Sequence, residues 1–429
     1  MRELRDSGIE WIGEMPKDWE IKRIQFCLEE IKEKNAPVQT EQVLSLVKDR
    51  GVMLYEEKGD VGNKSKTDVS EYKLAYPNTL VVNSMNILIG SVGISDYFGC
   101  VSPVYYVFKE TEFADLRFIN YVFNTRELQK ELRRYANGIL EIRLRVSASD
   151  IFKRKIPLPK KSEQSLIADF LDVKCKEIDE LASLITDEIE TLEQYKLSII
   201  TETTNKGLVR SELKDSGIEW LGEIAKDYEI CRVKDVTTLV TDGSHIAPDT
   251  SSEVYNFVSV ADMDDFGMID LKNCLQITEE QYDYLVRTGC KPQEHDVLIS
   301  KDGTIGKTTI VKNDTDFVVA SSLVIMRPSK AILPEYLQYC LMSGFVQEQL
   351  NSLLSGSALR RVSVGKNANL KIVFCKDINH QQDIVEYLDG KCQIINQAIL
   401  EKKEQLETLE QYKKSLIFEY VTGKKEVPA

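Results

Sequence analysis

The chain contains the same segments twice, and this repeat constrains its fold more than any other feature. Residues 6–14, Asp-Ser-Gly-Ile-Glu-Trp-Ile-Gly-Glu, return with one change at 215–223, and Leu-Glu-Gln-Tyr-Lys at 192–196 returns at 409–413. Two matches at nearly equal offsets are not expected by chance in 429 residues. The chain is therefore predicted to be a tandem duplication of a unit about half its length.

The middles of the two copies share a pattern rather than a sequence. Gly-Ser-Val-Gly at 90–93 corresponds to Gly-Thr-Ile-Gly at 303–306, and each is followed by a strand-like apolar run, at 101–108 and 318–326. A helix-like stretch comes next in each copy, at 116–135 and 334–354, and glycines (Gly138, Gly356) mark the two ends. The pattern predicts two mixed α/β (α+β) domains with one fold and different surfaces.

A long helix is predicted after each domain, because apolar residues recur there every seven residues. The stripe in the second helix is interrupted by Lys402. Each helix of about 40 residues would be roughly 60 Å long. Two long core helices are the alternative, but duplicated helices favour each other as antiparallel coiled-coil partners. The predicted seam consists of Leu171, Ile178, Leu181, Ile185, Leu192, Tyr195, Ile199, Leu388, Ile395, Leu406, Leu409, Tyr412 and Leu416, with Ile399 added in the second copy.

The predicted order is therefore domain, helix, domain, helix, with an approximate two-fold relation between the copies. The corresponding ranges are 1–160, 161–206, 207–377 and 378–424, with a tail at 425–429. Antiparallel helices would hold the two domains at opposite ends. DNA half-sites on one face of a duplex lie about 34 Å apart, so the helices are long enough to act as a ruler between two reading domains.

The net charge of −14 argues against DNA binding when it is taken over the whole chain. Charge acts locally, because salt screens it within roughly 8–10 Å. Residues 128–161 contain ten basic and three acidic side chains, and residues 359–376 contain five basic side chains and no acidic one. The candidate DNA contacts are Arg143, Arg145, Ser147, Lys153, Arg154, His245, Lys307, Arg360, Arg361, Ser363 and Lys366. Solvated basic edges and turns are the alternative interpretation of these residues.

No catalytic motif is complete. Gly306-Lys307-Thr308 lacks the upstream glycine of a phosphate-binding loop, because Lys301 occupies that position, although Lys307 could still face a phosphate. The Pro-Lys-Asp at 16–18 with Glu-Ile-Lys at 30–32 resembles a nuclease pattern, but the second copy has no counterpart. A methyltransferase active-site run and a glycine-rich cofactor loop are both absent, and the three histidines are too dispersed to predict a metal site. The chain is expected to bind no cofactor and no metal.

Nine cysteines without CxxC spacing are expected to be reduced and mostly buried, and the sequence contains neither a secretion signal nor a membrane-spanning run. A cytoplasmic protein is expected.

The two Asp-Ser-Gly-Ile-Glu-Trp-x-Gly-Glu openings, the Lys-Ile-Pro-Leu-Pro run at 155–159 and the paired helices ending in Leu-Glu-Gln-Tyr-Lys resemble those of Type I restriction–modification specificity subunits. The resemblance spans about residues 4–424. The second copy departs from the pattern, because Val-Phe-Cys-Lys at 373–376 has no proline and His380-Gln381 replaces Glu163-Gln164. The departure falls at the exit from the second domain, and the helix after it matches the pattern.

The resemblance implies two target-recognition domains, two spacer helices and an asymmetric, bipartite site on double-stranded DNA. It also implies partner subunits: two methyltransferases and restriction/translocase subunits, which would carry the adenine methylation and the ATP-dependent cleavage. S-adenosylmethionine, ATP and Mg²⁺ would belong to those partners. The alternatives are a self-sufficient restriction enzyme, which should show catalytic motifs, and a structural coiled-coil adaptor, which should enrich no DNA motif.

Overall fold

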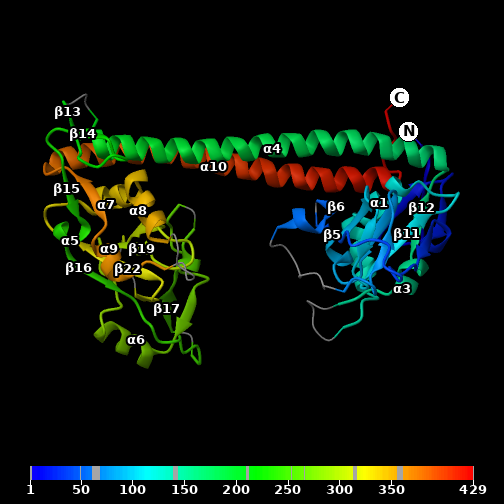
Figure 1. Ribbon diagram of the computed structural model, residues 1–429, viewed down its shortest axis with the longest axis horizontal. Coiled ribbons are helices and arrows are strands. Elements are labelled where there is room, and N and C mark those ends of the chain that lie inside the picture. Colours follow the sequence, from blue (N-terminus) through cyan, green and yellow to red (C-terminus); the bar gives the residue numbers. More distant parts are fainter. Residues whose placement is uncertain are drawn as a thin grey trace. The chain divides into compact units, whose positions relative to one another are not determined.

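The computed structural model describes residues 2–428 except 49, 60–67, 139–143, 209–211, 253, 265, 313–315 and 355–360. The chain forms two compact units, and Figure 1 labels their elements. Unit 1 comprises 1–184 with 405–429, and unit 2 comprises 185–404. Each long helix therefore contributes one part to each unit. No helix in the described part of the chain combines the length and apolarity needed to cross a bilayer.

The centre of unit 1 is a four-stranded antiparallel sheet in the order β4-β11-β8-β9. Its central strand β8 is buried along its whole length. The sheet strands are β4 (Leu28–Ile31), β8 (Thr79–Asn83), β9 (Val92–Ser95) and β11 (Tyr105–Glu110). Four two-stranded ladders surround the sheet: β1 (Leu4–Asp6) with β2 (Glu14–Pro16), β3 (Glu20–Arg23) with β12 (Lys155–Leu158), β5 (Leu44–Val47) with β6 (Gly51–Leu54), and β7 (Lys73–Ala75) with β10 (Gly99–Val101).

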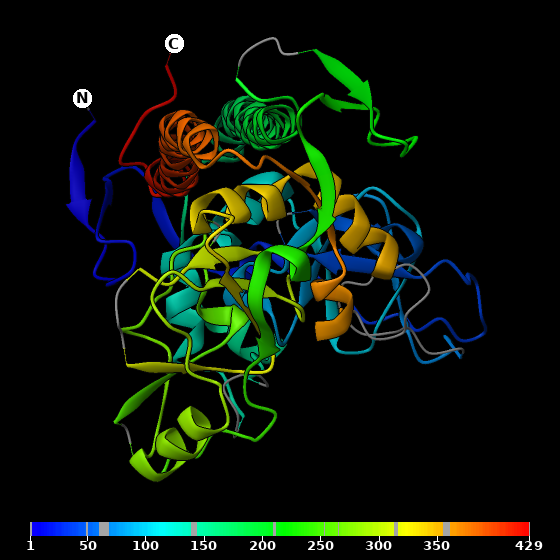
Figure 2. The ribbon, with the colours of Figure 1, turned by 90° about the vertical axis from the view of Figure 1, so that its left-hand side faces the viewer.

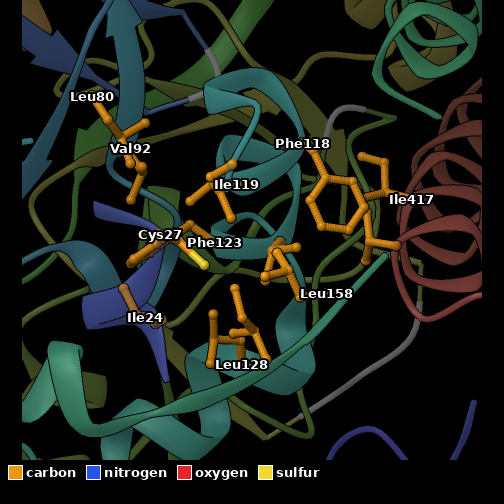
Figure 3. Close-up of a cluster of buried hydrophobic side chains, with 14 of the residues drawn as sticks. Ile24, Cys27, Leu80, Val92, Phe118, Ile119, Phe123, Leu128, Leu158 and Ile417 are labelled. Atoms are coloured by element: carbon orange, nitrogen blue, oxygen red, sulfur yellow. The ribbon is translucent and has the colours of Figure 1, made fainter. Parts of the chain in front are cut away.

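The helices of unit 1 pack on this sheet. They are α1 (Leu116–Phe123), α2 (Arg126–Arg133) and α3 (Ala148–Lys153), with 3-10 turns η1 (Ile24–Phe26), η2 (Tyr55–Lys58) and η3 (Ile87–Ile89). Figure 3 shows the buried cluster between them, in which Phe118 of α1 and Ile417 of the C-terminal helix lie together. The single helix expected at 116–135 is two helices. Thr125 ends the first run, because its side chain caps α2 by accepting a hydrogen bond from Leu128 N.

Unit 2 repeats this sheet in the order β16-β22-β19-β20. Its strands are β16 (Thr237–Asp242), β19 (Val297–Ser300), β20 (Thr308–Ile310) and β22 (Leu323–Pro328). The remaining strands are β13 (Leu213–Asp215) with β14 (Glu223–Ala225), β15 (Glu229–Arg232) with β23 (Lys371–Phe374), and the sheet of β18 (Leu275–Ile277), β17 (Tyr255–Val258) and β21 (Phe317–Val319). The two units thus share a sheet topology, as the duplication predicts.

The helices of unit 2 are α5 (Val233–Val236), α6 (Glu279–Arg287), α7 (Pro334–Met342), α8 (Gly344–Leu354) and α9 (Val364–Ala368), with a 3-10 turn η5 (Val260–Asp262). Within this unit α7 and α8 lie between the sheet and the long helices, and α6 lies at the far end (Figures 1 and 2). The helix expected at 334–354 is again two, broken at Ser343. The apolar runs at 101–108 and 318–326 are each two strands separated by a turn, β10 and β11 or β21 and β22.

The long helices are α4 (Lys161–Lys206) and α10 (Ile378–Val421). In unit 1 Lys413 binds Asp179 at 2.7 Å, and Phe170 packs on Tyr420. In unit 2 Lys402 lies 2.6 Å from Glu188 and Lys196 donates to Asn396 at 2.8 Å. Residue numbers rise along one helix as they fall along the other, so the pairing is antiparallel in each unit.

Three residues of the predicted seam lie outside it. Leu181, Tyr195 and Tyr412 are 45%, 54% and 52% exposed, whereas Leu171, Ile178, Ile185, Leu388, Ile395 and Leu416 are buried. The residues directly after two of them, Lys196 and Lys413, are half-buried instead, and Cys175 and Ile189, which were not predicted, are buried. Ile399 is buried and Leu406 is half-buried, as predicted. Hydrophobicity misled the prediction, because lysines can bury their stems and still present their ammonium groups to polar partners.

One buried glutamine joins each domain to its long helix. Gln164 Nε2 donates to the Phe113 and Pro159 carbonyls at 3.0 and 2.9 Å, and its Oε1 accepts from Asp115 N at 2.9 Å. Gln381 makes the same three bonds in unit 2, to the Ala331 and Cys375 carbonyls and from Leu333 N, at 3.0, 2.7 and 2.8 Å. The second domain therefore exits into its helix as the first does, despite its altered sequence.

Replacing either glutamine is expected to destabilise its own unit. Gln381→Leu leaves two carbonyls and one N–H unpaired in a fully buried place, which should cost about 3 kcal/mol. The neighbouring exposed Gln382 bonds only within its helix, so Gln382→Leu is the matched control and should change little. Chemical denaturation of both variants measures the difference, and equal unfolding midpoints would contradict the assignment.

All nine cysteines are free thiols, and eight of them are buried. Burial raises the pKa of Cys27 to about 12, so this thiol stays protonated at neutral pH. These residues are core side chains.

Candidate nucleic-acid interface

A basic segment crosses the end of the central sheet at an equivalent place in each unit. It comprises residues 145–154 in unit 1 and residues 361–366 in unit 2. Val146 N donates to the carbonyl of Ser84, directly after β8, at 3.0 Å. Val362 N donates to the carbonyl of Lys301, directly after β19, also at 3.0 Å. The arginine before each valine, Arg145 or Arg361, therefore occupies the same place on the two folds. The backbone contacts show this equivalence.

The two arginines differ in their partners. Arg145 is exposed, and its backbone pairs in both directions with Asn137 at 2.8 and 2.9 Å. Arg361, whose side chain is 45% exposed, has its Nε 3.3 Å from Asp302 Oδ1. Arg143 and Arg360, the other predicted arginines, lie outside the described residues.

The serines of these segments are helix caps. Ser147 Oγ accepts from Asp150 N at 3.0 Å, and Ser363 Oγ accepts from Lys366 N at 3.3 Å. Ser147 also donates to the Asp150 carboxylate at 2.6 Å. Capping satisfies N–H groups that a helix leaves free at its start, which explains both serines without a DNA contact. The Ser-x-x-Asp spacing at 147–150 was an available signal for this role.

The other basic candidates divide into exposed and enclosed side chains. Lys153, in the last turn of α3, and Lys366, in α9, are exposed. Arg154 is enclosed, because its guanidinium lies 3.3 Å from the centre of the Tyr135 ring and 3.5 Å from Glu131, with only 12% of the side chain exposed. Arg154 therefore stabilises the fold rather than extending to a ligand.

Lys307 is also held inside its own domain. Its Nζ donates to the carbonyls of Met263 and Asp264 at 3.2 and 3.4 Å, and its backbone N–H donates to Ser300 Oγ at 2.9 Å. The preceding Gly303 and Gly306 both have positive φ, as a tight connection between β19 and β20 requires. The glycine-rich segment is a turn between strands.

A polar cluster that sequence reasoning missed surrounds His245. Its Nε2 lies 2.9 Å from Asp242 Oδ2, and Lys301 Nζ donates to the same oxygen at 2.6 Å. Burial alone would raise the pKa of Asp242, but the bonds from Lys301 and His245 outweigh it and lower that pKa. The sequence alone distinguishes Lys301 only as the residue that replaces the upstream glycine of a phosphate-binding loop. Its partner lies 59 positions away, so no local pattern could have shown the pair.

Within the described ranges, no three His, Cys, Asp or Glu side chains are grouped closely enough to hold a metal ion. The chemistry that this surface offers is hydrogen bonding from arginine, lysine and histidine. These are the groups that proteins use for phosphate oxygens and for the acceptor edge of guanine.

The comparisons with known proteins agree with this chemistry. The family model described as Type I restriction modification DNA specificity domain matches the chain twice, over residues 16–193 and 225–411. The chain is 24% identical over 421 residues to the Type I restriction enzyme MjaVIII specificity subunit of Methanocaldococcus jannaschii, covering 96% of this chain and 93% of that protein. It is 23% identical over 246 residues to the EcoBI specificity subunit of Escherichia coli, covering 54% and 50%.

Among solved structures, a chain from work on complex assembly and conformational transition of the type I R-M system superposes with a TM-score of 0.67 at 15% identity. The match covers 96% of this chain and 99% of that one. At this identity the match shows a common fold.

Proposed function

This chain belongs to the Type I restriction modification DNA specificity family, and we propose that its two domains each read one half of a split DNA site. It is a DNA-recognition subunit, and the catalytic activities of the complex sit on other subunits. The observation that carries the proposal is that each unit holds a basic segment at the equivalent end of its own central sheet. This segment contains Arg145 in unit 1 and Arg361 in unit 2.

Arg145 and Arg361 occupy equivalent positions but have different neighbouring side chains, which supports recognition of two different half-sites. Ser84 follows β8 in unit 1, whereas Lys301 follows β19 in unit 2 and brings Asp242 and His245 with it. Arg361 has a carboxylate beside it, which restrains its guanidinium. Since sequence is read through side chains that reach base edges, a common fold with different groups at one surface can select different bases.

The long helices are proposed to set the gap between the half-sites. At about 1.5 Å per residue, α4 with its 46 residues is roughly 69 Å long, and α10 with its 44 residues is roughly 66 Å long. Half-sites one helical turn apart are separated by about 34 Å, which such helices can span. The heptad packing within each unit supports this role, because paired helices resist bending better than single ones.

The same duplication supports two methyltransferase subunits in the assembled complex, since two equivalent copies offer two equivalent attachment sites. Restriction/translocase subunits complete the proposed complex. S-adenosylmethionine, ATP and Mg²⁺ are proposed to bind those partners.

Arginine substitutions test the interface. In the complex purified through this chain, Arg145→Ala should weaken binding to the recognised site about tenfold and affect one half-site only, with Arg361→Ala acting on the other half. Loss of a base contact relaxes sequence specificity at one base position. Loss of a phosphate contact instead lowers the slope of log affinity against log salt concentration by about 0.9. Binding titrations at several salt concentrations distinguish these.

Lys176→Ala is the matched control, because Lys176 is 77% exposed on α4 and lies outside both basic segments. If both arginine variants bound like this control, the assigned surface would be wrong.

A further inference from the structure

Three hydrogen-bonded side chains in unit 2 become progressively more exposed from the core to the surface. Lys301 is only 2% exposed, the side chain of Asp242 is 19% exposed, and that of His245 is 60% exposed. One carboxylate oxygen of Asp242 is the hydrogen-bond partner of both other residues. A buried ammonium group is costly unless it is paired, so Lys301 fixes the carboxylate and the carboxylate fixes the exposed imidazole.

The backbone that carries His245 is also held in place. A Cβ at Gly243 would lie 2.0 Å from the Val319 carbonyl oxygen, so only glycine permits this close approach. Ser244 N then donates to the Val319 carbonyl, and Ser321 N donates to the Ser244 carbonyl, both at 2.8 Å. The imidazole is thus positioned before any ligand arrives, which lowers the entropy lost on binding.

The cluster adjoins the basic segment of its own unit. Lys301, which binds Asp242 through its side chain, accepts the hydrogen bond from Val362 N through its carbonyl. Val362 directly follows Arg361. His245 therefore belongs to the end of the sheet that carries Arg361, although the two residues are more than a hundred positions apart in the chain.

We propose that His245 is a positioned phosphate contact at this DNA interface, in which the protonated ring donates from Nε2 to Asp242 and from Nδ1 to a phosphate oxygen. Asp242 and Lys301 are positioning residues, because they act through His245. The inference rests on the proposed function, and it names the chemical group on DNA that this part of the site binds. A protonated histidine offers two donors, which suits an anion placed opposite the carboxylate.

Such a contact makes DNA binding depend on pH. The imidazole lies against the Asp242 carboxylate, and Lys301 binds the same carboxylate oxygen. Only the protonated ring can donate from both nitrogens, so the contribution of this contact to binding is present at low pH and is lost at high pH.

The test uses the complete complex and a duplex carrying its recognised site, titrated at about pH 6 and about pH 8, on either side of the ordinary histidine pKa of about 6.5. Wild type should bind three- to tenfold more tightly at the lower pH, and His245→Asn should remove this dependence. At the lower pH the same variant should lower the salt slope by about 0.9. Asp242→Asn should weaken binding at the lower pH, because the imidazolium loses the carboxylate that positions it.

His295→Asn is the matched control. His295 is 64% exposed, lies 3.9 Å from Glu294 and precedes β19, whereas Lys301 follows that strand. This variant should keep the wild-type pH and salt dependence. If His245→Asn also kept both, the inference would be overturned while the proposed function stood. If wild type bound the recognised duplex no better than a scrambled one, the proposed function would fail and this inference with it.

Discussion

Replacing residues 18–160 with the corresponding domain of another family member changes one half of the recognised site and leaves the other half unchanged. The exchanged range contains every strand of the unit 1 sheet and both strands of the β3–β12 ladder, so no ladder is cut. The expected loss of affinity for the original site is about 10⁴-fold, because a wrong half-site removes several base contacts worth about 1–3 kcal/mol each. Selection from a pool of random duplexes measures both halves at once.

The junction to α4 decides whether this exchange folds. Gln164, Asp169 and Asp172 stay in the recipient, and they bind the incoming domain through its carbonyls and through the equivalents of Arg117 and Tyr121. A donor that keeps those two side chains is therefore required. The reciprocal exchange of 207–377 is the control and should alter only the other half. A change in both halves after either exchange would contradict independent reading.

Inserting one heptad into each long helix lengthens the unread gap and leaves both half-sites intact. The insertions belong after Leu184 in α4 and after Glu404 in α10, where the chain passes between its two units. Seven residues add about 10 Å, which equals about three base pairs, and they preserve the phase of the seam. The original site should lose roughly 10³-fold in affinity, because its half-sites no longer match the span.

Inserting the heptad into α4 alone is the control for this prediction. It leaves α10 without matching partners and should destabilise the helix pair rather than produce a longer site. The measurement is again selection from random duplexes, made with the doubly extended chain in its complex. An unchanged gap would show that the helices do not set the spacing. Altered half-sites would show that the helices also affect which bases the domains read.

Repetition within the sequence was enough to predict the architecture, because two copies of one unit must solve the same packing problem. The bounds of α4 followed from the sequence pattern. The seam did not. Residues three and four positions along a helix are both neighbours, and the apolar Leu181 and Tyr195 suggested the wrong one.

The sequence indicated which segments are basic, but the structure assigns several of the candidate DNA contacts to other roles. A sequence shows that residues are basic or polar but not which protein groups they already bind. Arg154 lies on Tyr135, Lys307 binds backbone carbonyls, and Ser147 caps a helix, so each has a structural role. Conversely, Lys301 and Asp242 became significant only when the fold brought them together.

The central claim is that one chain reads two separate short sequences at a fixed distance, and it is tested most directly by the motif that its complex selects. Random duplexes should be enriched for a single motif with two specified stretches and an unspecified gap between them, and the same motif should be methylated in the host genome. One uninterrupted motif, or two stretches whose separation varies freely, would contradict the account.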